Sequence, residues 1–69
     1  MRDINRLDNF YNILKELHKS ISDWRFGQFM MNFIEWYRFK YNKDIFYIEE
    51  DKMIKLIKEF LNDMEIKYA

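Results

Sequence analysis

The sequence predicts an all-α protein, a compact three-helix bundle with a short aromatic connection before the last helix. Proline, valine and threonine are missing and glycine occurs once, so residues that break helices or favour strands are scarce. Three segments repeat apolar residues at spacings of three and four, the period of one helix face. The 69 residues make one domain, residues 1–69, whose core supplies only about 3–5 kcal/mol.

The first helix is expected from Asp3 to Ser20 or Ile21. Asp3 can accept hydrogen bonds from the free amides of the first turn. Ser22 or Asp23 is expected to cap the next helix in the same way. The apolar stripe of the first helix consists of Ile4, Leu7, Tyr11, Leu14, His18 and Ile21, and Phe10 and Leu17 widen it.

The middle helix is expected from Trp24 or Phe26 to Tyr41 and is apolar nearly all round, which predicts burial nearly all round. Its polar strip is narrow and consists of Gln28, Asn32, Glu35 and Arg38. We assign one stripe to the intramolecular core: Phe26, Phe29, Met30, Phe33 and Tyr37. The apolar residues left over, Met31, Ile34, Trp36 and Phe39, form a surplus that a three-helix monomer does not readily bury.

The last helix is expected to begin with the acids at 49–51. Its apolar stripe is Met53, Leu56, Ile57, Phe60, Leu61 and Met64. Residues 45–48 could form a strand, a turn or a loop, and residues 65–69 are expected to fray. Gly27 is tolerable near a helix start and could permit close approach of another backbone.

Composition limits the function. The net charge is zero, so nothing demands a nucleic acid or an acidic membrane. The charge is uneven: residues 1–43 carry eight basic residues against five acids, and residues 44–69 carry seven acids against four lysines. These halves could pair within one chain or between subunits. No signal-peptide pattern or membrane span of about 20 apolar residues is present, so we expect a cytoplasmic protein.

No catalytic constellation, metal site or cofactor is expected. Cysteine is absent and His18 is the only histidine, which leaves few metal ligands. His18 could act as a general base for Ser22, but an interfacial histidine bonded to a nearby side chain or carbonyl is the plainer interpretation. The protein is therefore interpreted as a non-enzyme.

Two sets of charged residues are further candidates for binding sites. Glu49, Glu50 and Asp51 suit the positive end of a helix dipole and could also form an acidic contact patch for a basic partner surface. A calcium loop would need alternating ligands and a turn glycine, which are missing. Basic residues interleaved with aromatics favour nucleic-acid contact as an alternative function; these are Arg25, Arg38, Lys40, Lys43, Trp24, Trp36, Tyr37 and Tyr41.

Three short segments carry a resemblance to known proteins. They are Asn5-Arg6-Leu7-Asp8, Asp23-Trp24-Arg25-Phe26-Gly27-Gln28 and Asp44-Ile45-Phe46-Tyr47-Ile48-Glu49-Glu50-Asp51. Together they resemble a family of very short uncharacterised bacterial and phage proteins, over Asp3 to about Phe60. Trp24 and Phe26 stand where that family more often has leucine. The resemblance implies a compact helical fold and supplies no activity.

These features favour a non-catalytic protein–protein interaction module that forms a homodimer, docks on a target protein, or does both through its aromatic middle helix. The expected partner-binding residues are Arg25, Gln28, Met31, Ile34, Trp36 and Phe39. Small size and a Lys-, Asn- and Ile-rich composition typical of AT-rich genomes suit a phage or mobile-element inhibitor of a host defence protein. The alternative is a small helical nucleic-acid-binding regulator.

Overall fold

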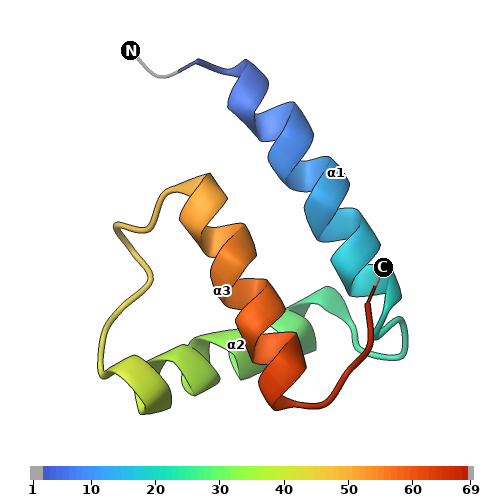
Figure 1. Ribbon diagram of the computed structural model, residues 1–69, viewed down its shortest axis with the longest axis vertical. Coiled ribbons are helices and arrows are strands. Elements are labelled where there is room, and N and C mark those ends of the chain that lie inside the picture. The colour runs from blue at the N-terminus through green and yellow to red at the C-terminus, as the bar shows by residue number, and fades with distance from the viewer. Residues whose placement is uncertain (1–2, 69) are drawn as a thin grey trace.

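The computed structural model describes residues 3–68 and contains three helices (Figure 1): α1 (Asn5–Lys19), α2 (Phe26–Tyr41) and α3 (Glu50–Asp63). No strand occurs among the described residues. The all-α, three-helix prediction is confirmed, and the boundaries lie within about two residues of those expected from apolar spacing.

α1 and α3 run side by side in the same direction, and α2 crosses near the end of α3 (Figure 1). The start of α1 is joined to the start of α3 by the Arg6–Glu50 ion pair, at 2.8 Å. The rings of Phe29 and Phe33 on α2 meet Phe60 on α3, with centroids 6.5 Å and 5.8 Å from it. α3 is thus the element against which both other helices pack.

The core contains residues from all three helices, with α3 supplying half of them. Phe29, Phe33, Ile57 and Leu61 have no solvent exposure, and Phe60 is 1% exposed. Burial of such side chains stabilises the fold by roughly 1.5–3 kcal/mol each. The complete set of buried apolar residues is Leu14, Leu17, Phe29, Phe33, Tyr37, Ile54, Leu56, Ile57, Phe60 and Leu61.

The predicted core stripe of α2 is correct at Phe29, Phe33 and Tyr37 and wrong at Phe26, which is 54% exposed. Phe26 is the first residue of α2. The centroid of the His18 ring lies 6.1 Å from that of Phe26. Helical periodicity places Phe26 on the same side of α2 as Phe29 and Phe33. The side chain is nevertheless exposed, because the neighbouring helices do not cover that end of α2.

The helix starts agree only in part with the predicted caps. Oδ1 of Asp3 accepts a hydrogen bond from the Asn5 amide at 3.0 Å, but the N-cap residue of α1 is Ile4, one residue after the predicted cap. The start of α2 is capped differently, because its N-cap residue is Arg25 rather than Ser22 or Asp23. The Gln28 side chain accepts from the Arg25 amide at 2.7 Å, which is the second half of a capping box.

Residues 45–48 form a turn, not a strand. The Ile48 amide donates to the Ile45 carbonyl at 3.0 Å, and the Phe46 amide donates to Oδ1 of Asp44 at 2.9 Å. Ile45 and Ile48 pack against the core. The two central residues, Phe46 and Tyr47, are left at the surface.

The segment after α3 does not fray, contrary to the prediction for its described part, residues 65–68. The Ile66 amide donates to the Leu61 carbonyl at 2.8 Å and the Glu65 amide to the Asn62 carbonyl at 3.0 Å. This is the Schellman arrangement that closes many helices. Ile66 and Tyr68 then pack against the core. Ala69 lies outside the described residues.

The Schellman motif places Glu65 in the left-handed region, at φ 60°, where a side chain costs about 1–2 kcal/mol relative to glycine. We expect Glu65→Gly to raise the free energy of unfolding by about 1 kcal/mol, measured by urea denaturation. Lys55→Gly, in the exposed interior of α3, is the matched control and should lower it by roughly 0.5–1 kcal/mol. A loss of stability in both variants would contradict the left-handed C-cap.

Candidate interaction surface

The six predicted contact residues of α2 do not share one surface. Arg25, Gln28, Met31 and Phe39 are exposed, whereas Ile34 and Trp36 are half-buried and pack against the core. Phe39 is 93% exposed and Met31 57%. Of the predicted apolar surplus, Met31 and Phe39 therefore remain open to solvent.

Trp36 has partners within the chain that the sequence did not indicate. Its ring lies 5.9 Å from that of Phe33 and 5.6 Å from that of Phe60. Its indole Nε1 donates to Oδ2 of Asp63 at 2.8 Å. Trp36 therefore joins α2 to the end of α3.

Lys40 lies at the centre of an ionic network that fixes the end of α2 on α3. Its ammonium group is 2.8 Å from Oε2 of Glu59 and 2.8 Å from Oδ2 of Asp63. The same group lies 5.4 Å from the centre of the Trp36 ring. The Tyr41 hydroxyl donates to the Glu59 carboxylate. The basic first half and acidic second half of the chain therefore pair within one molecule here.

The network shifts the titration of its members. The hydrogen bond to Asp63, followed by that to Glu59, raises the pKa of Lys40 above its usual range. The hydrogen bond from Lys40 lowers the pKa of both carboxyl groups, helped by Tyr41 at Glu59 and by Trp36 at Asp63. The bond to Glu59 raises the pKa of Tyr41. Each shift favours the protonation state that the network uses at neutral pH.

Gly27 is not a packing point within the chain. A Cβ added there would meet no described atom within 4 Å. The side-chain oxygen of Gln28 accepts the hydrogen bond that caps α2, which gives this residue a structural role. Arg25 is exposed at the N-cap position.

His18 is hydrogen-bonded to a nearby carbonyl, the plainer of the two interpretations given above. Its Nε2 donates to the Trp24 carbonyl at 2.8 Å, and its ring lies 5.2 Å from that of Phe29. The imidazole therefore holds the connection between α1 and α2 against the core. This hydrogen bond does not involve Ser22.

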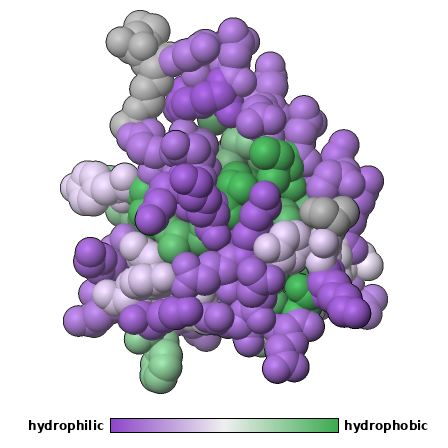
Figure 2. All heavy atoms as spheres, viewed as in Figure 1, coloured by the Kyte–Doolittle hydropathy of each residue, from purple (hydrophilic) through white to green (hydrophobic). Residues whose placement is uncertain are grey.

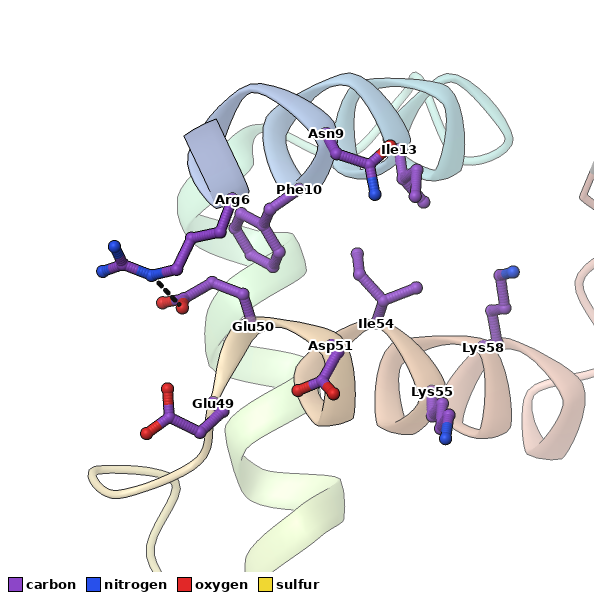
Figure 3. Close-up of a pocket in the computed structure, with 10 residues that line it drawn as sticks. All are labelled: Arg6, Asn9, Phe10, Ile13, Glu49, Glu50, Asp51, Ile54, Lys55 and Lys58. Carbon is purple, nitrogen blue, oxygen red and sulfur yellow. Dashed lines mark hydrogen bonds and ion pairs between the residues drawn. The ribbon is translucent and has the colours of Figure 1, made fainter. Parts of the chain in front are cut away.

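The acids at the start of α3 border a groove between α1 and α3 (Figure 3). Asp51 accepts a hydrogen bond from the Lys52 amide, and Glu50 pairs with Arg6. Phe10, Ile13 and Ile54 contribute apolar side chains to the groove, whose volume is about 430 Å³. Figure 2 shows hydrophobic atoms between these helices on a largely hydrophilic face.

The turn between α2 and α3 contains an exposed aromatic pair. The sequence analysis did not predict that these two residues would form part of the surface. Phe46 is 78% and Tyr47 89% exposed, with ring centroids 4.8 Å apart in an edge-to-face arrangement. The signal was present, because Asp44 can nucleate a turn over the next two residues. Residues at the centre of a tight turn have little chance of burial.

Among residues 3–68, no group of three or more potential metal ligands is found. Within the same residues, no helix is long and apolar enough to cross a membrane. The chain has no significant match among protein-family models, curated proteins or solved structures. The family resemblance in the sequence analysis therefore stays a prediction.

Proposed function

We propose that the protein is a non-catalytic protein–protein interaction module that presents the outer face of α2 to its partner. This face is defined here as Gln28, Met31, Asn32, Glu35, Arg38 and Phe39, all of which are exposed. The observation that carries the proposal is the 93% exposure of Phe39, a large aromatic side chain in the last turn of α2.

An exposed apolar side chain is not unusual by itself. Phe39 is different because Met31, eight residues earlier on the same i, i+4 ridge of α2, is also exposed. Large exposed aromatic and methionine side chains are the types enriched in protein interfaces. The opposite side of α2 is already engaged with α3 through Phe33, Trp36 and Lys40.

Nucleic-acid binding is less well supported. Lys40, one of its expected contacts, is held by two carboxylates, and Trp36 is held against the core. The narrower role of a phage or mobile-element inhibitor of a host defence protein is part of the proposal. It is supported only by the small size, the composition and the family resemblance.

Photocrosslinking tests the proposed surface. A benzophenone amino acid in place of Phe39, in cells that produce the protein, should form several-fold more protein adducts than the same group in place of Tyr11. Tyr11 is a matched control because it is an aromatic residue on α1 with 59% exposure. Equal yields at both positions, or adducts with nucleic acid alone, would refute the proposal.

A further inference from the structure

We propose that the outer face of α2 binds a second copy of the same chain, antiparallel, about a two-fold axis that passes beside Glu35. The inference rests on the proposed function and names the partner of that surface. It follows from the order of side chains along the face and from its charges.

The apolar residues of the face are symmetric about Glu35. Met31 and Phe39 each lie four residues from it, which places the three residues on one i, i+4 ridge of the helix surface. With a rise of 1.5 Å per residue, the apolar residues lie about 6 Å to either side of Glu35. A two-fold axis at Glu35 therefore places Met31 of each copy on Phe39 of the other, so the same contact forms twice.

The charges of the face are self-complementary under the same axis. Glu35 and Arg38 are exposed, and no ion pair joins either of them to another residue in the described part of the chain. In the antiparallel pair, Arg38 of each copy lies one turn from Glu35 of the other. Two carboxylates and two guanidinium groups then meet at the centre, with no net charge.

This balance favours a second copy over a strongly charged target. A basic or acidic protein surface would match one of the two charges and oppose the other, and like charges brought together at an interface lower affinity. Antiparallel helices also place opposite ends of their dipoles side by side. No described atom blocks the approach at Gly27, near the start of the same helix.

The face also contains Gln28 and Asn32, so its apolar area is small and the association should be weak. Small interfaces of this kind are typical of transient complexes. We therefore expect a monomer–dimer equilibrium across micromolar to millimolar chain concentrations, rather than a permanent dimer. Sedimentation equilibrium of the full chain measures it directly.

Charge reversal tests the axis. Glu35→Arg alone and Arg38→Glu alone should each weaken self-association at least tenfold, because every copy then carries like charges at the centre. An equimolar mixture of the two variants should form a heterodimer at least as tight as the unaltered homodimer, since each charge again faces its opposite. Recovery on mixing requires that the charged positions 35 and 38 of one copy lie close to those of the other.

The controls are Lys15→Glu and Glu16→Arg on the exposed side of α1, which should leave the unaltered equilibrium in place, alone and mixed. Circular dichroism checks that every variant is folded. A protein that stays monomeric at millimolar concentration overturns the second copy as partner, while crosslinking at position 39 still decides the proposed function. A dimer that ignores both α2 charge reversals overturns this interface.

Discussion

Phe33→Ala should leave most of the protein unfolded at room temperature. Phe33 has no solvent exposure, meets Phe60 edge to face at 5.8 Å and stacks on Trp36 at 5.9 Å. Truncation of a buried phenylalanine to alanine costs about 3–5 kcal/mol. A single core of this size supplies about the same amount. Circular dichroism during urea denaturation measures the loss.

Phe39→Ala is the matched control, because it makes the same chemical change on the same helix at a side chain that is 93% exposed. Surface substitutions usually change stability by no more than about 0.5 kcal/mol. At low chain concentration we therefore expect an unfolding midpoint close to that of the unaltered protein. Similar losses in the two variants would mean that the burial pattern of α2 is wrong.

The fold could be predicted largely from the sequence, because an amphipathic helix shows itself in local spacing. The predicted stripes were wrong at Ile4, Tyr11 and Met64, which are exposed. Leu14, Ile57 and Phe60 are buried as their stripes required. The hydrogen bond from the Asn5 amide to Asp3 was also predictable, since these residues are only two positions apart in the chain. These features depend on the helix alone and need no knowledge of what packs against it.

Features that depend on the meeting of distant segments could not be predicted. Phe26 belongs to the correct stripe, but α3 covers only part of the length of α2. Trp36 lies off that stripe and is nevertheless held by Phe60 and Asp63. Ile66 lies after the end of the apolar pattern of α3. It returns to the core because Glu65 adopts a left-handed conformation, and the sequence does not mark this turn with the glycine that usually occupies such a position.

The candidate surface was foreseen in part for the same reason. The narrow polar strip of the middle helix marked the side that faces water, and Met31 and Phe39 lie beside that strip. Sequence reasoning could not tell them from Ile34 and Trp36, which also lie off the core stripe. The distinction depends on the direction in which α3 crosses α2, which no local pattern encodes.

The Lys40 network should make stability depend on pH. Folding lowers the pKa of Glu59 and Asp63 from usual values of 4.5 and 3.8. The unfolded state therefore binds more protons in this range, and stability falls as pH decreases. The contribution is fully present above these usual values and is lost as pH falls through the folded-state pKa values.

Lys40→Met removes the charge and retains an unbranched apolar chain beside Trp36. At pH 7 the variant should be less stable than the unaltered protein, because two neighbouring carboxylates lose their shared cation. The difference should shrink through the range in which the carboxyl groups become protonated and should vanish below it, since neither protein then has the ion pairs. Urea denaturation at a series of pH values measures this convergence.

Lys43→Met is the control, because Lys43 is exposed in the connection after α2 and forms no ion pair with the residues described. It should change stability little, and equally at every pH. A difference between Lys40→Met and the unaltered protein that persists at low pH would assign the effect of Lys40 to its contact with the Trp36 and Tyr41 rings, at 5.4 Å and 6.0 Å. Only convergence at low pH assigns it to Glu59 and Asp63, since their charge is the part of the network that acid removes.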